Sequence, residues 1–429
     1  MSNIFNYVFS RRNLLKASLL SLMPVGAASA ATLGVTSKLE SPIGSNSARI
    51  QVTSNQNISV YIEYGYSRAK YTFKTSLVTL KSGTPVSILL SNLKPSSKVF
   101  YRIRYSLKTT GTFLAKTEAS FTTGAPSANT VFAIQADPHM DENSDGTVYS
   151  NTLQQVVAAA PAFLMDLGDI FMVDKLQDKS EANIRARFEL MLGYYKKLGS
   201  VPLKICLGNH DGELGYSKFN TKNYRREYFP EQTGELAYFS FEGPDQLHVV
   251  LDPFTYTTSN PKDDGWQWTL GKTQYDWLKN TLSSSTATHK FIYIHHLLVG
   301  NATSRGGVEI AMRNEWGGQN NDGSPGFESN RPGWGKPIHQ LLLDNKVGFV
   351  FKGHDHLYVK QELDGIIYQT VPQPSHPGDK LDVKQYGYLS GKGVGGSGFI
   401  KVRTDAKTAF VDFVKHDGTI ADSYSRLSS

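Results

Sequence analysis

The sequence predicts a mixed fold, in which an N-terminal antiparallel β-sandwich is followed by an α/β domain. Residues 34–123 alternate apolar and polar residues over short runs separated by turn residues, which is typical of antiparallel strands. Beyond residue 130, continuous apolar runs, typical of strands covered on both faces, alternate with helix-like stretches such as residues 180–199 and 271–285. The 429 residues, of which 39% are hydrophobic, are enough to build two such cores.

Residues 1–30 have the pattern of an export signal. The stretch "SRRNLLK", from Ser10 to Lys16, precedes a short apolar run and a small-residue cleavage site before Ala31. The paired arginines resemble the twin-arginine signal, which implies export by the twin-arginine translocase to the periplasm or the medium. The apolar run is shorter than the roughly 20 residues that span a bilayer and contains Pro24, so no stable membrane insertion is expected.

The net charge of the chain is too small to indicate binding to nucleic acid or to a membrane surface. The formal net charge is +7, and removal of the three basic residues of the signal would leave 7 − 3 = +4, without a long basic run. The single cysteine, Cys206, cannot form an intramolecular disulfide and lies in an apolar run, so we expect a core residue there.

Residues 34–123 contain no cluster of metal-binding side chains and are expected to form an accessory domain. Their stretch "LSNLKPSSKVFYRIRY" resembles the fibronectin type III pattern, in which a Leu-x-Pro corner leads into a tyrosine-rich strand. The Gly/Pro/Ser-rich segment "GAPSANT" then predicts a linker to the second domain, expected at residues 130–416.

Five apolar runs of the second domain end in polar residues: "TVFAIQADPH", "PAFLMDLGD", "PLKICLGNHD", "HKFIYIHH" and "VGFVFKGHDH". Each of these ends alone could be a turn or a solvated strand end. Because ligands of α/β sheets gather outside the carboxyl ends of the strands, their succession predicts one shared site. His354 and His356, two residues apart, are expected to point the same way on an extended segment.

The donors at these strand ends suit two divalent ions. Carboxylate, amide and imidazole ligands without thiolates favour Mn, Fe, Zn, Co or Ni over softer metals, and the identity of the metal stays open. The order D-x-H, GD, GNH[D/E], H and GHxH resembles the calcineurin-like metallophosphoesterase superfamily, whose fold is a two-sheet sandwich flanked by helices. This resemblance implies that Asp137, His139 and His356 bind one ion, that Asn209, His295 and His354 bind the other, and that Asp169 bridges both.

The resemblance also implies a catalytic role for His210. Two divalent ions carry four positive charges, and Asp137, Asp169 and a bridging hydroxide remove three, so the site would stay cationic and favour a phosphoryl group. His210 would assist the leaving group, and Asp211 or a nearby aspartate would fix its tautomer. A simple turn-stabilising role for Asp211 is the alternative.

Two positions depart from related patterns. In purple acid phosphatases a tyrosine lies three residues after the bridging aspartate, whereas this chain has Met172, which predicts a colourless metal pair. In the metallophosphoesterase superfamily, a proline commonly follows the histidine at the fourth of the five strand ends. This proline is absent here, so either His295 or His296 could be the ligand. We favour His295, which directly continues the apolar strand. Residues 299–335 are rich in Gly, Asn and Trp and are expected to form a loop that faces the substrate. Whether Arg305, Glu309 or Arg313 contacts the substrate there stays open.

The function that the sequence predicts is that of an exported metal-dependent hydrolase. Its substrate would be a small-molecule phosphate monoester or diester, hydrolysed by attack of a metal-bridging hydroxide. The alternative is a non-catalytic protein that uses the same scaffold to bind a partner or a surface.

Overall fold

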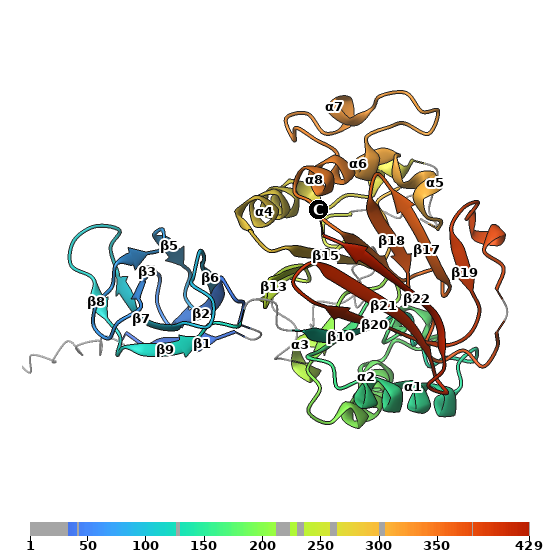
Figure 1. Ribbon diagram of the computed structural model, residues 1–429, viewed down its shortest axis with the longest axis horizontal. Coiled ribbons are helices and arrows are strands. Elements are labelled where there is room, and N and C mark those ends of the chain that lie inside the picture. The colour runs from blue at the N-terminus through green and yellow to red at the C-terminus, as the bar shows by residue number, and fades with distance from the viewer. Residues whose placement is uncertain are drawn as a thin grey trace, which may run out of the picture.

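A computed structural model describes residues 33–40, 43–125, 129–211, 224–229, 236–257, 264–299, 305–379 and 381–428. The predicted export signal lies outside these residues. Figure 1 shows a smaller sheet-rich region, coloured blue to cyan, beside a larger region that mixes sheets and helices. The predicted mixed fold is therefore confirmed. Within the described parts of the chain, no helix is long and apolar enough to cross a membrane.

The N-terminal region contains two antiparallel sheets that share one core. One sheet has the order β1-β2-β6, and the other has the order β4-β3-β7-β8, with β5 paired to β3 and β9 paired to β7. Strand β2 alternates buried and half-buried residues, as the sequence predicts for a strand with one face in a core. The strands are Val35–Leu39 (β1), Ala48–Ser54 (β2), Ile58–Gly65 (β3), Phe73–Lys74 (β4), Val78–Leu80 (β5), Val86–Leu90 (β6), Lys98–Ser106 (β7), Leu114–Ala115 (β8) and Ala119–Thr122 (β9).

The first sheet of the larger region has six strands in the order β12-β11-β10-β20-β21-β22. Strands β10, β11 and β12 are parallel to one another, whereas β20 to β22 add antiparallel strands at one side. Every residue of β11 is buried, as expected for a parallel strand covered on both faces. The strands are Thr130–Gln135 (β10), Leu164–Asp166 (β11), Leu203–Ile205 (β12), Gly398–Thr404 (β20), Thr408–Lys415 (β21) and Ile420–Leu427 (β22).

The second sheet has seven strands in the order β13-β14-β15-β16-β18-β17-β19. Its centre, from β14 to β18, is parallel, and every residue of β15 and β16 is buried. The strands are Phe239–Gly243 (β13), Gln246–Val250 (β14), His289–Ile294 (β15), Phe349–Lys352 (β16), Tyr358–Leu363 (β17), Ile366–Thr370 (β18) and Lys392–Val394 (β19).

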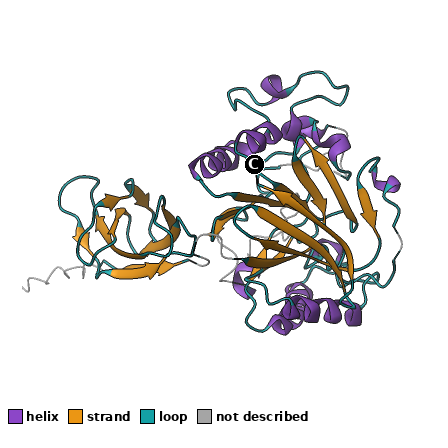
Figure 2. Ribbon diagram, viewed as in Figure 1, coloured by secondary structure: helices purple, strands orange, loops and turns teal. Residues whose placement is uncertain are grey.

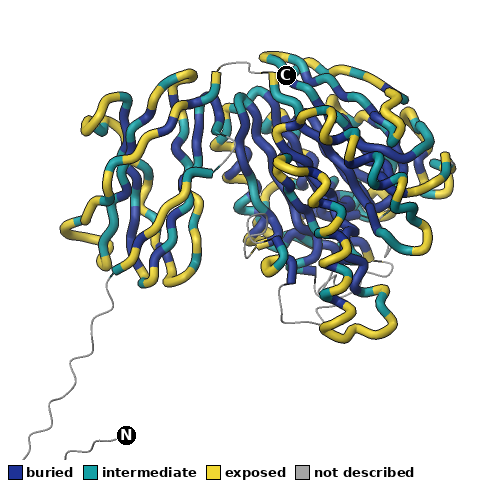
Figure 3. The backbone as a smooth tube through the Cα atoms, turned by 90° about the horizontal axis from the view of Figure 1, so that it is seen from below, coloured by how far each residue is buried: buried dark blue, intermediate teal, exposed yellow. Residues whose placement is uncertain are grey.

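The two sheets face each other across one apolar core, and helices cover their outer faces (Figure 2). Phe132 of the six-stranded sheet and Phe291 of the seven-stranded sheet belong to the same buried cluster, with ring centroids 5.1 Å apart. Figure 3 shows this buried layer as dark blue strands beneath a more exposed surface. The predicted two-sheet sandwich flanked by helices is thus present.

The two helices α1 and α2 begin where the sequence supplies a capping side chain. Helix α1 (Gly146–Ala158) is capped by Asp145, whose side chain accepts from the backbone N–H groups of the first turn. Helix α2 (Glu181–Tyr195) is capped by Ser180 in the same way. The remaining helices are Tyr224–Tyr228 (α3), Gly271–Ser284 (α4), Val308–Ala311 (α5), Asn314–Gly317 (α6), Phe327–Asn330 (α7) and Ile338–Asp344 (α8), with 3-10 turns Val173–Lys175 (η1), Lys196–Leu198 (η2), Gly265–Gln267 (η3) and Lys384–Tyr386 (η4).

Candidate metal centre

Side chains from both sheets meet where the parallel strands end. Asp137, Asp169 and Asn209 follow β10, β11 and β12, whereas His295 and His354 follow β15 and β16. Parallel strands bring their carboxyl ends to one edge, which is why residues far apart in the sequence gather there. The predicted convergence of the five strand ends is therefore present in the fold.

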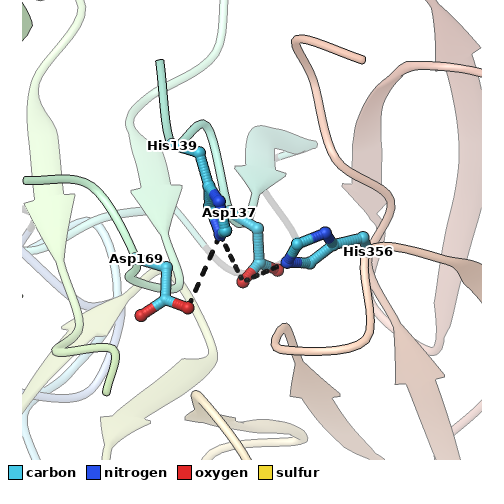
Figure 4. A group of neighbouring side chains, drawn as sticks. All are labelled: Asp137, His139, Asp169 and His356. Atoms are coloured by element: carbon cyan, nitrogen blue, oxygen red, sulfur yellow. Dashed lines mark ion pairs between the residues drawn. The ribbon is translucent and has the colours of Figure 1, made fainter. Parts of the chain in front are cut away.

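A first group of possible metal ligands comprises Asp137, His139, Asp169 and His356 (Figure 4). His139 Nε2 lies 3.6 Å from Asp169 Oδ2 and 4.0 Å from Asp137 Oδ1. On the other side, His356 Nε2 lies 3.7 Å from Asp137 Oδ1. The donor atoms thus surround a common point, and three of the four residues are buried.

A second group comprises Asp169, His295 and His354 and shares its carboxylate with the first. His295 Nε2 lies 3.4 Å from Asp169 Oδ2 and 3.3 Å from His354 Nδ1. The Asn209 side chain joins this group, because its Oδ1 lies 3.0 Å from His295 Nε2. Asp169 is accordingly placed between the two groups.

Two observations on these groups are those expected of sites that bind cations. One is the spacing of the donor atoms, and the other is the lack of a hydrogen bond at one buried nitrogen. Ligands held about 2.0–2.2 Å from one ion lie roughly 3–4 Å from each other, as these atoms do. The buried His139 Nε2 makes no hydrogen bond within the described residues, although an isolated buried polar atom is costly. Its other ring nitrogen, Nδ1, lies 3.2 Å from Asp141, the kind of contact that orients a metal-binding imidazole.

The ligand loops hold an unfavourable backbone conformation. Asp137, His139, Asp169, His354 and His356 all have positive φ, between 50° and 72°, although none is a glycine. Such conformations cost of order 1–3 kcal/mol each and persist where surrounding contacts impose them. The expectation that His354 and His356 lie on an extended segment was therefore wrong, because the chain leaves the β conformation directly after β16. The two imidazoles accordingly belong to different groups.

Asp211 holds one of these loops by its backbone. Its carboxylate accepts hydrogen bonds from the amides of Asp169, Ile170 and Phe171 at 2.6–2.8 Å, and from Gly208 at 2.7 Å. The structure therefore places Asp211 against the loop of the shared carboxylate, and its position matches the turn-stabilising alternative.

Arg187 holds the same loop and its neighbour from helix α2. Its guanidinium donates to the carbonyl of Phe171 at 2.9 Å, to that of Met140 at 2.9 Å and to that of His139 at 2.5 Å. One side chain thus connects the loop after β10 with the loop after β11. Burial lowers the pKa of Arg187, but a guanidinium with so high an ordinary pKa remains charged.

His210 lies beside the first group with a carboxylate partner of its own. The ring centroids of His139 and His210 are 6.0 Å apart, and His210 Nδ1 lies 2.8 Å from Asp174 Oδ2 in turn η1. A carboxylate at Nδ1 fixes the tautomer and leaves Nε2 for chemistry. The nearby aspartate expected for this role is therefore Asp174, which lies 36 residues from His210, too far for spacing to reveal it.

The two histidines nearest the shared carboxylate gain protons more readily than a free imidazole. Burial alone would lower the pKa of His139, but contacts with Asp141 and Asp169 outweigh it and raise that pKa to about 10. For His295, the negative charge of Asp169 likewise outweighs burial and raises the pKa to about 9. Burial, followed by the charge of His139, lowers the pKa of His356 to about 3.

His296 is buried beside the second group, with its ring centroid 5.2 Å from that of His354, but it is not among the residues of either group. Its ring packs against Trp268, with centroids 4.4 Å apart, and its Nδ1 lies 2.8 Å from the carbonyl oxygen of Leu297. His295, by contrast, belongs to the second group. The geometry thus agrees with the preference for His295. Met172, which takes the place of the tyrosine described above for purple acid phosphatases, is buried.

The fold and the site together place a candidate metal centre at the strand ends of two facing sheets. The chain belongs to the calcineurin-like phosphoesterase family, whose model matches residues 130–358. No curated protein matches the chain.

The solved structures that match the chain include three of low identity. A purple acid phosphatase from yellow lupin (Lupinus luteus) seeds is 15% identical, with 91% of this chain and 74% of that chain covered and a TM-score of 0.48. PhoD is 14% identical, with coverages of 92% and 90% and a TM-score of 0.49. A dimetal phosphatase from Danio rerio is 11% identical, with coverages of 70% and 99% and a TM-score of 0.43. At these identities and TM-scores, the similarity gives no information about substrate or activity.

Proposed function

We propose that the protein is an exported two-metal phosphoesterase that hydrolyses phosphate monoesters or diesters. The observation that carries this proposal is the position of Asp169 between two groups of metal-binding side chains. A carboxylate in this position suits a pair of ions about 3.5–4 Å apart, the spacing of two-metal hydrolases. Membership of the calcineurin-like phosphoesterase family supports the same reaction class.

In this proposal, bound ions would activate a water molecule and neutralise the phosphoryl oxygens. Asp137, His139, His356 and the shared Asp169 would hold one ion, and Asn209, His295 and His354 would complete the other site. His210, oriented by Asp174, would donate a proton from Nε2 to the leaving oxygen. Because Met172 takes the place of a tyrosine, the metal-loaded protein should show no visible charge-transfer band.

The export signal and the fibronectin type III-like nature of residues 34–123 belong to the same proposal. The paired Arg11 and Arg12 support recognition by the twin-arginine translocase. Replacement of both by lysine should leave the protein in the cytoplasm, whereas unchanged export would contradict this route.

Turnover of p-nitrophenyl phosphate and its bis ester tests the proposed activity. The purified protein, reconstituted with Mn, Fe, Zn, Co or Ni, should hydrolyse at least one of them and contain two metal equivalents. Asp169→Asn should lose both activity and metal, whereas Asp344→Asn, which changes an exposed carboxylate in α8, should lose neither. Absence of turnover with every metal would favour the non-catalytic alternative, in which the scaffold only binds a partner or surface.

A further inference from the structure

Arg305 lies at the edge of the candidate metal centre, on the segment that precedes α5. Its Nη1 donates to the carbonyl of His354 at 3.1 Å and lies 3.4 Å from Asp355 Oδ1. Its guanidinium also stacks over the ring of Tyr386, 4.6 Å from the ring centroid. These contacts hold the side chain beside the loop that carries His354 and His356.

The positive charge of Arg305 is not needed to neutralise Asp355. The buried Lys352 already donates to Asp355 Oδ2 at 2.7 Å, and the exposed fractions of these two side chains are 1% and 0%. The hydroxyl of Tyr388 and the backbone amide of Gly306 donate to the same oxygen. Asp355 and Lys352 thus form a compensated pair, and Arg305 adds a net positive charge beside the metal ligands.

The guanidinium of Arg305 also keeps free donors. Its side chain is 32% exposed, and neither Nε nor Nη2 makes a hydrogen bond to any of the described residues. The side chain of the neighbouring ligand His356 is exposed to the same extent. Both side chains can therefore be reached from solvent at the edge of the candidate centre.

We infer that Arg305 is a specificity-determining residue, which binds the phosphoryl group of a phosphate monoester and makes the enzyme prefer monoesters to diesters. This inference rests on the proposed function. The phosphoryl group of a monoester carries about two negative charges near neutral pH and three unesterified oxygens. A guanidinium can bind two such oxygens with parallel N–H donors. A diester carries one negative charge and has an organic group on one of those oxygens, so it gains less from Arg305.

Two substitutions in the full chain, reconstituted with metal, test this inference. Arg305→Gln should lower kcat/KM for p-nitrophenyl phosphate by about 10- to 100-fold, as expected for loss of a charge-assisted hydrogen bond. The same change should lower kcat/KM for bis(p-nitrophenyl) phosphate much less. Arg305→Lys should lie between, because lysine keeps the charge but not the paired donors. Lys272→Gln, which removes an exposed positive charge from α4, is the matched control and should leave both substrates unaffected.

Metal content and phosphate binding distinguish the possible results. The inference requires that Arg305→Gln keep the metal content of the wild type while inorganic phosphate binds less tightly. Equal losses for both substrates, no loss for either, or a loss of metal would overturn it. If the wild type turns over neither substrate, the proposed function is wrong. Calorimetry with inorganic phosphate then still decides whether Arg305 binds a phosphoryl anion. Unchanged phosphate binding in Arg305→Gln would refute this role of Arg305 as well.

Discussion

The contact between His210 and Asp174 assigns a positioning role to a residue that sequence spacing does not reveal. Asp174 Oδ2 lies 2.8 Å from His210 Nδ1. This contact fixes the tautomer of the imidazole and leaves Nε2 available for proton transfer. Replacement of His210 by alanine should lower kcat by about 100- to 10,000-fold for an alkyl phosphate, whose leaving group needs a proton. Asp174→Asn should cause a smaller loss in the same direction.

The leaving group provides the control for this prediction. p-Nitrophenolate leaves without a proton, so both variants should lose much less activity toward p-nitrophenyl phosphate than toward an alkyl phosphate. A steady-state comparison of the two substrates measures the difference. Equal losses for the two leaving groups would show that His210 does not act as the acid.

Arg187 is expected to act on metal binding through two backbone loops. Its guanidinium holds the carbonyls of His139, Met140 and Phe171, and glutamine cannot reach all three. Arg187→Gln should therefore weaken binding of the ion held by His139 by about tenfold or more, as loss of a supporting contact commonly does. Metal titration followed by elemental analysis would measure this. Arg185→Gln, on the same helix but bonded to Glu181 and Glu227, should bind metal normally, and an equal effect of both variants would contradict the prediction.

The raised pKa values of His139 and His295 predict proton release when metal binds. With pKa values of about 10 and about 9, both imidazoles are protonated at pH 7 in the metal-free protein. A cation needs their lone pairs, so it must displace these protons, and the affinity should rise by about tenfold per pH unit for each proton released. The rise should extend from pH 7 through the lower of the two pKa values.

Calorimetry in buffers of different ionisation enthalpy measures this release directly. We expect release of about two protons per protein at pH 7, when both groups bind an ion, and of fewer at pH 10. Metal binding without any proton release at pH 7 would show that the two imidazoles are already neutral.

At the scale of the elements, the apolar pattern of the sequence predicted the five strands that end at the candidate centre and two of the longer helices. Runs such as "FIYI" in β15 are buried along their whole length, and α2 and α4 begin and end within a few residues of the predicted stretches. A continuous apolar run leaves a strand few alternatives to a doubly covered sheet. The arrangement in two sheets came from the family resemblance, and the strand order was not predicted, because nothing in local periodicity fixes which strands pair.

The ligand loops were only partly predictable for a physical reason. The donor types and their place after the strands could be read from the sequence, whereas the positive φ values of Asp137, His139 and His354 could not, since these residues rarely adopt them. The conformation depends on contacts from distant segments, such as those of Arg187 and Asp211. The partner of His210 was hidden for the same reason.

The core between the two sheets should respond strongly to a cavity. Phe291 of β15 is fully buried among aromatic residues of both sheets, so Phe291→Ala should lower the free energy of unfolding by about 3–5 kcal/mol. All five tryptophans lie between residues 266 and 334, so their fluorescence during denaturation reports this region. Phe73→Ala, a half-exposed residue of the N-terminal region, should leave that transition unchanged, and a shift as large as that of Phe291→Ala would contradict the assignment of separate cores.

At the scale of the whole molecule, the candidate centre depends only on the larger region. All of its candidate ligand residues within the described parts of the chain lie between residues 137 and 356. Contacts between the two regions include the hydrogen bonds of Asn46 with Thr286 and of Arg49 with Ser240, neither of which involves a candidate ligand. A chain that begins at residue 129 should therefore keep its metal content and its kcat for p-nitrophenyl phosphate within about twofold, an allowance for small losses of stability. Loss of metal from this shortened chain would show that the N-terminal region supports the centre.

Because the donors follow strands of both sheets, a bound cation would tie the two layers together. Any sliding of one layer past the other would stretch bonds to the ion, so a filled centre should resist shear between them. The energetic link is reciprocal: ion binding stabilises the folded chain by RT ln(1 + [L]/Kd), and loosening of the layers must weaken binding. Supply of metal in its surroundings would then govern how long the folded protein lasts as well as how fast it works.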